Sequence, residues 1–301
     1  MDLRQLEYFV RVAELGSFTR AAGVIGVAQP ALSRQVRLLE VELRQTLLLR
    51  NGRGATVTEA GRILLEHGRG ILHQIERAKE DLAAAGRTPA GRVAVGLPPT
   101  VARALSVPLT RAFRKRLPQA ALTLSEGLSA SMIESLAAGR LDIALLYNPA
   151  PAAELELKPL VDEQLMLVSK AGRASAKAAT IRLADVAPLP LIVPSRPNAI
   201  RMRIESALAE VGCRPTIAFE IDGVAAILAL VADGAGHAIL PPFAVSTAAR
   251  PESLHARRIV RPAIQSRLAI ATSAHRPATL TQRTMVTLIE DIARSVFNSR
   301  G

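Results

Sequence analysis

A short stretch of the sequence carries an amide, a hydroxyl and two guanidinium groups at helical spacing. Gln29, Ser33 and Arg37 follow one another at intervals of four residues, and Pro30 and Arg34 lie beside them. Glutamine can pair with adenine, arginine with guanine, and serine with a base or a phosphate. On a helix these residues would share one face, opposite a leucine and valine stripe. The pattern predicts a surface that reads base edges in a DNA groove; a merely solvated helix face is the alternative.

Four further polar residues suit contacts with a DNA backbone. Ser17 and Thr19 lie at the start of a short predicted helix, where hydroxyls and free N–H groups hold phosphate. Arg50 and Arg53 flank a predicted tight turn, from which they could reach the backbone or the minor groove. Residues 1–88 hold 13 basic and 10 acidic residues, a net charge of +3, whereas the whole chain carries +12. DNA binding by this part would therefore depend on where its arginines lie and not on its overall charge.

Three helices and a hairpin must position these side chains. Apolar residues recur at helical spacing in three segments, 3–15, 18–25 and 29–43. Gly16 and Gly26 separate the segments, and Pro30 suits the first turn of the third. The short connection between the last two is typical of a helix-turn-helix. Apolar runs around Asn51-Gly52 predict a hairpin. We therefore expect a winged helix-turn-helix DNA-binding domain in residues 1–58.

A long helix is expected over residues 59–86. Thr58 is suited to cap it, and Glu59 in the first turn favours its dipole. Apolar or small residues repeat along it at alternating intervals of four and three, the pattern of a coiled-coil seam. We expect this helix to join two copies of the chain; packing within one chain is the alternative. The stretch 87–91 would be a hinge. The seam residues are Leu64, Gly68, Ile71, Ile75, Ala78 and Leu82.

From residue 92 onward, predicted strands alternate with predicted helices, which favours parallel sheets covered by helices. Two rounds of the pattern predict a two-lobed α/β effector domain over 92–301, like a periplasmic binding protein. Lobe I would comprise about 92–163 and 267–301, and lobe II about 164–266. We expect strands at 92–97, 122–127, 141–147, 164–170, 190–194, 216–221, 237–241 and 266–273, and helices at 101–117, 129–138, 198–211, 223–232 and 281–299.

A hinged two-lobed domain binds small molecules between its lobes, where helix N-termini point into the cleft. Polar residues follow several predicted strands here, at junctions whose free backbone N–H groups favour an anion. Asp222 marks a further junction, where its carboxylate would repel an anion. We expect a small, anionic effector; helix capping alone is the alternative. The candidate effector-binding residues are Thr100, Ser129, Ser195, Arg196, Asn198 and Arg201.

The sequence offers little for other chemistry. The five histidines lack metal-ligand spacing, the single cysteine, Cys213, excludes a disulfide framework, and no phosphate-binding loop or nucleophile elbow occurs. We expect no metal, no cofactor and no enzymatic activity. No uncharged apolar run reaches the length of about 18 residues that suggests a membrane span. The charged N-terminus is unlike a signal peptide, so we expect a reduced, cytoplasmic setting.

Three sequence elements occur together and in order: Ser-Phe-Thr-x-Ala-Ala, Gln-Pro-Ala-Leu-Ser-Arg-Gln and Thr-x-Ala-Gly. With them, residues 1–65 resemble the DNA-binding region of LysR-type transcriptional regulators, and the long helix and two lobes match the rest of that family. Gln-Pro-Ala-Leu-Ser and Arg-Val-Ala-Val-Gly-Leu-Pro-Pro-Thr are most similar to its nitrogen assimilation control subgroup. Residues 47–49 are all leucine, where the family commonly has an aromatic residue ahead of Arg50, so we expect a slightly altered wing base.

The resemblance implies a sequence-specific regulator that binds double-stranded DNA at a palindromic promoter site. It further implies homodimers that assemble into a homotetramer and bend the DNA. Effector binding would change the packing of the lobes and so the spacing of the DNA-binding domains. The alternative is a cytoplasmic small-molecule binding protein that uses the two lobes without a transcriptional role, and residues 1–58 argue against it.

Overall fold

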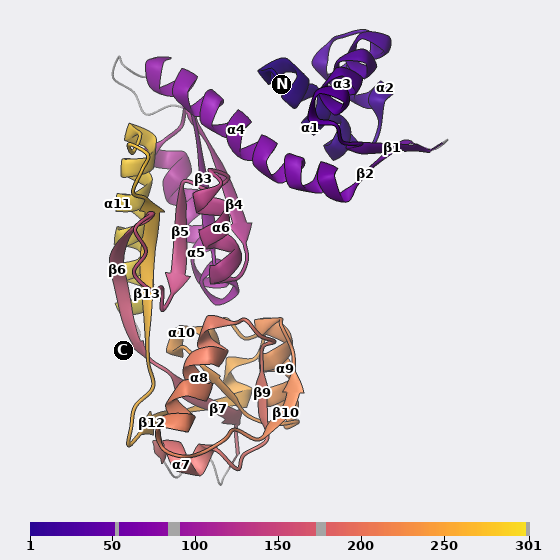
Figure 1. The fold of residues 1–301 in the computed structure, drawn as a ribbon. Helices are drawn as coiled ribbons and strands as arrows, with labels where there is room; N and C mark the ends of the chain where they lie inside the picture. Colours follow the sequence, from indigo (N-terminus) through magenta and orange to yellow (C-terminus); the bar gives the residue numbers. More distant parts are fainter. Residues whose placement is uncertain (52–53, 84–90, 173–178, 299–301) are drawn as a thin grey trace. The chain divides into compact units, whose positions relative to one another are not determined.

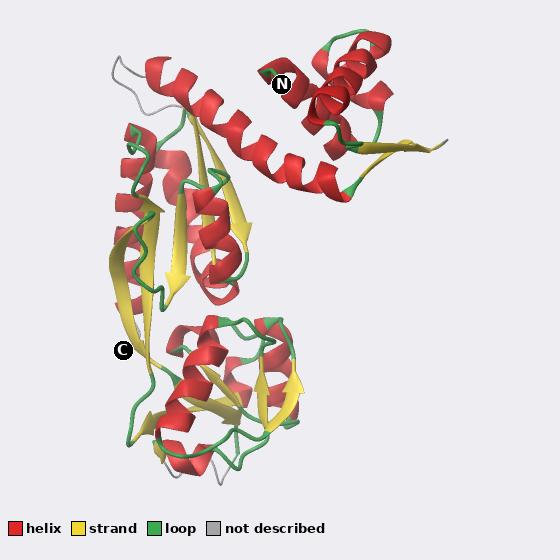
Figure 2. Cartoon of the chain, in the orientation of Figure 1, coloured by secondary structure: helices red, strands yellow, loops and turns green. Residues whose placement is uncertain are grey.

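The computed structural model describes residues 1–51, 54–83, 91–172 and 179–298. The chain divides into two compact units, Met1–Gly86 with Ala138–Arg140, and Arg87–Ala137 with Leu141–Gly301. The first unit consists of helices and one short hairpin, and the second consists of β-sheets covered by helices (Figures 1 and 2). The DNA-binding candidates lie in the first unit, and the effector-binding candidates lie in the second.

The ends of the first helices are set by local capping groups. The Asp2 carboxylate accepts a hydrogen bond from the Gln5 N–H at 2.7 Å, and the Ser17 hydroxyl caps the second helix. Gly16, at φ +61°, ends the first helix with its N–H bonded to the Val12 carbonyl. The three predicted helices are confirmed. They are α1 (Leu3–Leu15), α2 (Phe18–Ile25) and α3 (Gln29–Leu43).

The apolar stripes of these helices meet in one core, which includes Phe9, Leu32, Val36 and Leu39. Helix α4 (Glu59–Ala83) completes this core with Leu65, while Leu64 packs at its margin. A Cβ at Gly68 would lie 2.9 Å from Val10 Cγ2, so the absence of a side chain there lets α4 lie close against α1. The first part of α4 is therefore held by its own chain.

A hairpin of β1 (Leu48–Asn51) and β2 (Gly54–Val57) follows α3. The Glu40 Oε1 atom, on α3, accepts hydrogen bonds from the N–H groups of Leu47 at 2.8 Å and Leu48 at 3.1 Å. Leu47 and Leu48 are buried, whereas Leu49 is 56% exposed. The all-leucine base thus contributes two core residues, and Glu40 ties the hairpin to α3.

The other strand of the hairpin is tied to the first helix through its backbone. The Ala55 N–H donates to the Gly16 carbonyl at 2.9 Å. Gly54 adopts φ +154°, and a Cβ there would meet the Gly16 oxygen at 2.4 Å. Only glycine fits position 54, because both the backbone conformation and the available space exclude a side chain.

Replacing Glu40 by alanine is expected to lower the free energy of unfolding by about 1.5–3 kcal/mol, because two backbone N–H groups lose a charged acceptor. Glu40→Gln keeps an acceptor oxygen in the same place and should cost less than half as much. Thermal unfolding followed by circular dichroism measures both variants. Equal losses for alanine and glutamine would show that the two hydrogen bonds do not hold the hairpin.

The first lobe of the second unit contains one five-stranded sheet in the order β4-β3-β5-β13-β6. Strands β3, β4 and β5 are parallel, and β13 pairs antiparallel with β5 and β6. The chain therefore returns to this lobe after passing through the second. The elements are β3 (Gly91–Leu97), α5 (Pro99–Arg116), β4 (Ala120–Glu126), α6 (Ser129–Ala137), β5 (Ile143–Tyr147), β6 (Leu155–Gln164), β13 (Gln265–Ser273) and α11 (Leu280–Asn298).

Both faces of this sheet are covered, as the apolar strands require. Val95 and Leu145 belong to the core on the side of α5 and α11, where Leu105 is fully buried. Ala94 and Leu146 alternate with them and belong to the core on the side of α6. This three-layer arrangement brings the N-termini of α5 and α6 to the carboxyl edge of the parallel strands.

The second lobe contains a four-stranded sheet in the order β11-β7-β12-β8 and a parallel pair, β9 with β10. Helices α8 and α9 follow β9 and β10, so their N-termini also lie at strand ends. The elements are β7 (Met166–Lys170), β8 (Thr180–Arg182), α7 (Leu183–Val186), β9 (Leu191–Val193), α8 (Ala199–Glu210), β10 (Ile217–Glu220), α9 (Val224–Asp233), β11 (Ala238–Leu240), α10 (Pro242–Val245), a 3-10 turn (Pro251–Ser253) and β12 (Leu254–Val260).

The predicted α/β architecture is confirmed, but several strands differ from expectation. The strand expected at 164–170 is divided, because Gln164 ends β6 and Met166 begins β7. Strands β6, β8 and β12 were not predicted. Strand β6 lies at the sheet edge, contains Pro159 and exposes charged residues, which an edge strand tolerates. Strand β12 carries two adjacent arginines and pairs with β7, far away in sequence.

Candidate functional site

The polar face of α3 is formed as the sequence predicts. Gln29, Pro30, Ser33, Arg34 and Arg37 line one surface concavity with Glu40; this set of five is the α3 face below. Pro30, Arg34 and Arg37 are exposed, whereas Leu32, Val36 and Leu39 on the opposite side are fully buried. Within the described part of the chain, neither guanidinium takes part in an ion pair. The α3 face therefore presents two guanidinium groups outward and places an amide and a hydroxyl in the same concavity.

The other DNA-binding candidates are placed less completely. Ser17 Oγ accepts a hydrogen bond from the Arg20 N–H at 3.3 Å, so it caps α2. Thr19 is exposed in the first turn of the same helix. Arg50 lies on β1, but its side chain is outside the described residues, as is the whole of Arg53. Of these four residues, the structure therefore describes the side chains of Ser17 and Thr19 only.

The seam residues of α4 fall into two groups. Leu64 and Gly68 pack against the core of the first unit, which corresponds to the alternative of packing within one chain. Ile71, Ala78 and Leu82 are exposed, Leu82 by 79%. Ile75 is half-buried. The contact between two copies can therefore use only the part of the seam from Ile71 onward.

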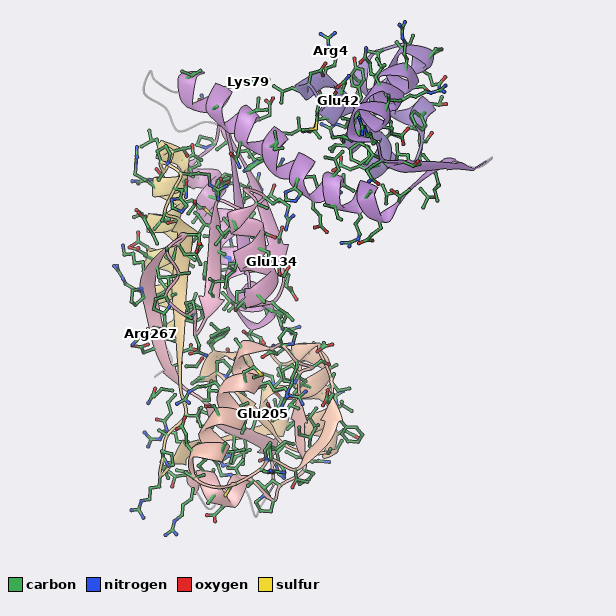
Figure 3. The ribbon with its side chains drawn as sticks, in the orientation of Figure 1. Arg4, Glu42, Lys79, Glu134, Glu205 and Arg267 are labelled. Carbon is green, nitrogen blue, oxygen red and sulfur yellow. The ribbon has the colours of Figure 1, made fainter. Side chains whose placement is uncertain are left out.

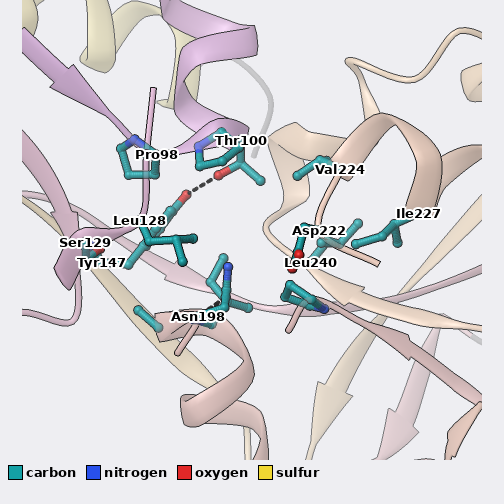
Figure 4. A pocket seen from close by; sticks show the side chains of 15 residues that line it. Pro98, Thr100, Leu128, Ser129, Tyr147, Asn198, Asp222, Val224, Ile227 and Leu240 are labelled. Atoms are coloured by element: carbon teal, nitrogen blue, oxygen red, sulfur yellow. Dashed lines mark hydrogen bonds between the residues drawn. The ribbon is translucent and has the colours of Figure 1, made fainter. Parts of the chain in front are cut away.

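The second unit holds a cavity lined by both lobes (Figure 4). About 40 Å³ of it is open to the centres of water molecules. The N-termini of α5, α6, α8 and α9 meet there. The lining residues are Pro98, Pro99, Thr100, Gly127, Leu128, Ser129, Tyr147, Pro194, Asn198, Ala199, Ile200, Asp222, Val224, Ile227 and Leu240. Three of the six candidate residues, Thr100, Ser129 and Asn198, are therefore brought together.

Each of these three polar groups has a local partner. Thr100 Oγ1 lies 3.3 Å from the Tyr147 hydroxyl, the hydrogen bond drawn in Figure 4. Ser129 Oγ accepts from the Tyr147 N–H at 3.2 Å. Asn198 Oδ1 caps α8 by accepting from the N–H groups of Ile200 at 3.0 Å and Arg201 at 3.2 Å. Helix capping thus accounts for Asn198, while Thr100 forms a hydroxyl pair with Tyr147.

The structure does not bring Ser195, Arg196 or Arg201 to the cavity. Arg201 is buried, and its guanidinium bonds Glu205 at 3.0 Å, Glu220 at 2.9 Å and the Pro194 carbonyl at 2.9 Å. This network was not predicted, although Glu205 follows Arg201 at the i+4 spacing of a helical ion pair. Glu205 lies on α8 (Figure 3).

The outer members of this network are occupied as well. Arg196 is exposed and bonds the same Glu205 at 2.6 Å. The Ser195 N–H donates to Asp222 Oδ1 at 2.8 Å. The positive charges expected to neutralise an anion are therefore used within the protein.

Two lining residues were not among the candidates. Tyr147 ends the buried strand β5, and Asp222 precedes α9. Burial and the charge of Glu163 raise the pKa of Tyr147 well above its ordinary value, which keeps its hydroxyl protonated. A polar group at the carboxyl end of a buried parallel strand is the signal that could have found Tyr147.

Glu163 lies at the end of β6, close to this tyrosine. Its side chain is 7% exposed, and its Oε2 atom has no hydrogen-bond partner among the described residues. Burial raises the pKa of Glu163 to about 8. A carboxyl group that is protonated at neutral pH therefore lies close to Tyr147, which lines the cavity.

Two family profiles together match nearly the whole chain. Residues 3–62 match the bacterial regulatory helix-turn-helix protein, lysR family, and residues 86–294 match the LysR substrate binding domain. The chain belongs to the LysR family. It is a LysR-type transcriptional regulator with a helix-turn-helix DNA-binding domain and an effector-binding domain, and it is not an enzyme. The family favours the transcriptional role over a clamp that only binds small molecules.

Individual relatives agree with this assignment. The chain is 38% identical over 275 residues to the nitrogen assimilation regulatory protein nac of Klebsiella aerogenes, covering 91% of this chain and 89% of the relative. It is 34% identical to the nac protein of Escherichia coli (strain K12), covering 99% and 96%. The expected similarity to the nitrogen assimilation control subgroup is confirmed. Full-length CbnR, solved in complex with its target DNA, has a TM-score of 0.72 at 26% identity, covering 98% and 100%.

The described part of this LysR-type chain offers neither a metal-ligand cluster nor a membrane-spanning helix. In residues 1–51, 54–83, 91–172 and 179–298, no group of three or more His, Cys, Asp or Glu side chains could hold a metal ion. None of the helices in those residues combines the length and the apolar character needed to cross a membrane.

Proposed function

We propose that the α3 face reads base edges in the major groove of promoter DNA. The observation that carries this proposal is the two-sidedness of α3, with buried apolar residues on one side and the exposed guanidinium groups of Arg34 and Arg37 on the other. Arg34 and Arg37 suit guanine, and Gln29 suits adenine. Ser17, Thr19, Arg50 and Arg53 would contact the DNA backbone. CbnR, which shares the fold and is solved with DNA, supports the assignment.

We propose further that α4 joins two copies of the chain through Ile71, Ile75, Ala78 and Leu82. A dimer would place two α3 helices about one DNA turn apart, roughly 34 Å, and so would favour a palindromic site. Two such dimers would form a homotetramer, as the family resemblance implies. The protein would act in the cytoplasm, where promoter DNA is found.

The cavity between the lobes is the proposed effector site, with Thr100, Ser129 and Asn198 in its wall. Four helix N-termini converge on it, which supports a ligand with an anionic group. A ligand that favours one packing of the lobes over another would change the spacing of the DNA-binding domains. A coupling of about 1–3 kcal/mol is enough to switch promoter occupancy.

Replacing Arg34 by alanine is expected to weaken specific DNA binding by about 5- to 150-fold, because one bidentate base contact is worth about 1–3 kcal/mol. The measurement is a binding titration on the DNA upstream of the protein's own gene. Wild-type binding should fall steeply with salt, with a logarithmic slope near −0.9 per phosphate contacted.

The matched control is Arg11→Ala on α1, which removes an exposed arginine already paired with Glu14 at 3.6 Å. It should leave the affinity within about twofold, since exposed ion pairs contribute little. Equal weakening by both variants would contradict readout by the α3 face. So would unchanged binding by Arg34→Ala.

A further inference from the structure

The wall of the effector cavity contains a hydroxyl pair with one hydrogen to spare. Thr100 and Tyr147 are 5% and 4% exposed, and their oxygens lie 3.3 Å apart. Each hydroxyl carries one hydrogen, and a single hydrogen bond between them uses only one of the two. No other partner of either hydroxyl occurs among the described residues. Whichever group donates within the pair, the other hydroxyl retains a hydrogen for an acceptor in the cavity.

The same wall offers a favourable position for a carboxylate. Thr100 lies in the first turn of α5, and Ser129 begins α6, so backbone N–H groups and helix dipoles are directed here. A buried hydroxyl with a spare hydrogen adds a further donor. A carboxylate would accept from the hydroxyl pair without displacing any contact described above.

The facing wall, in lobe II, favours a cationic group instead of a carboxylate. Asp222 lines the cavity and is exposed, and among the described residues its one hydrogen-bond donor is the Ser195 N–H at 2.8 Å. No lysine or arginine lines the cavity, and within the described part of the chain Asp222 has no ion pair. The Asp222 carboxylate would repel an acid on this side and attract an ammonium group.

The remaining lining is apolar and the space is small. Leu128, Val224, Ile227 and Leu240 belong to the wall. About 40 Å³ of the cavity is open to the centres of water-sized groups, so its enclosed part suits a small ligand. A bulky or strongly hydrated ligand does not suit it.

We propose that this cavity selects a small α-amino acid, with its carboxylate at the Thr100–Tyr147 pair and its ammonium group at Asp222. The inference rests on the proposed effector site and specifies its ligand class. A ligand with only one of the two charged groups would leave either the spare hydroxyl hydrogen without an acceptor or the Asp222 charge uncompensated. The cavity therefore favours ligands that carry both a carboxylate and an ammonium group.

The test compares three molecules of nearly equal size in calorimetric titrations of the full-length protein. Alanine carries both groups, propionate lacks the ammonium group, and ethylamine lacks the carboxylate. Alanine should bind at least about tenfold more tightly than either of the others, as expected for one hydrogen bond to a charged group. Propionate or ethylamine binding as tightly as alanine would overturn the proposal. So would the absence of binding by all three.

Variants in each wall test which wall binds the ammonium group of the ligand and which binds its carboxylate. Asp222→Asn keeps an acceptor for the Ser195 N–H but removes the charge, so it should remove most of the preference for alanine over propionate. The double variant Thr100→Val with Tyr147→Phe removes both hydroxyl hydrogens, so it should weaken alanine and propionate by similar factors. The control is Asp185→Asn, an exposed carboxylate on α7 outside the cavity, which should change nothing. An unchanged preference in Asp222→Asn would contradict the role of that residue.

The DNA titration separates this inference from the proposed function. Wild-type protein that binds its promoter but prefers no amino acid retains the regulatory function and loses the proposed ligand class. Loss of alanine binding in Asp222→Asn with DNA affinity unchanged in the absence of ligand would support both.

Discussion

Replacing Arg201 by alanine is expected to destabilise the effector domain by about 1.5–3 kcal/mol, because a buried guanidinium loses its hydrogen bonds to charged and carbonyl oxygens. Arg201 is 5% exposed and bonds two carboxylates and a carbonyl, which joins α8 to β10 and to the end of β9. Its loss leaves the Pro194 carbonyl without its donor and removes the hydrogen bond that lowers the pKa of Glu220. Chemical unfolding of the full chain, followed by circular dichroism, measures the change.

The protein supplies a matched control in Arg196. This arginine bonds the same Glu205, but it is exposed. Arg196→Ala is expected to cost less than about 1 kcal/mol, because exposed ion pairs are screened by water. If the two alanine variants lose the same stability, burial of Arg201 is not what makes its network important.

Replacing Glu163 by glutamine is expected to stabilise the protein at alkaline pH and to remove one pH-dependent contribution to stability. The folded carboxyl has a pKa of about 8, against an ordinary value of 4.5 in the unfolded chain. Between these values the folded state holds a proton that the unfolded state has lost. Wild-type stability from this group therefore falls as pH rises from about 4.5 to about 8.

The size of this effect follows from the same difference. At about 1.36 kcal/mol per pKa unit, the full penalty above pH 8 is on the order of 5 kcal/mol. Glutamine has nearly the same shape and cannot ionise, so the gap between variant and wild type should grow with pH and then level off. Urea unfolding at several pH values from 5 to 9 gives that gap directly.

Glu156→Gln is the control for the Glu163 experiment. Glu156 lies on the same strand but is exposed. Its replacement should leave the pH dependence of unfolding unchanged. A constant difference between Glu163→Gln and wild type across this pH range would show that the Glu163 carboxyl is ionised in the fold.

The elements of the DNA-binding domain could be predicted because local groups decide where its helices end. Asp2, Ser17 and Gly16 act within one helical turn of the residues that they cap. Strands β6 and β12 depend instead on partners far away in the chain, since β6 pairs with β13 and β12 with β7. The residues of β6 and β12 include many charges, so their local sequence does not indicate those pairings.

The effector cavity shows the same limit at the level of single residues. Thr100, Ser129 and Asn198 could be placed because strand-to-helix junctions gather at one edge of a sheet. Arg201 could not, because its neighbours Glu205 and Glu220 decide that it turns away from the cavity. Tyr147 has the pattern of a core residue, and only its position at the strand end distinguishes it.

The contact between Gly16 and Gly54 bears on how this regulator can change over evolutionary time. The hairpin is anchored to α1 by main-chain atoms, through the hydrogen bond from the Ala55 N–H to the Gly16 carbonyl at 2.9 Å. The direction of the wing therefore does not depend on which side chains it displays. We expect substitutions of its exposed, described side chains to alter the preferred DNA sequence at little cost in folding, while both glycines resist replacement. Because main-chain atoms hold the hairpin, single side-chain substitutions on it can adapt the regulator to new operator sequences.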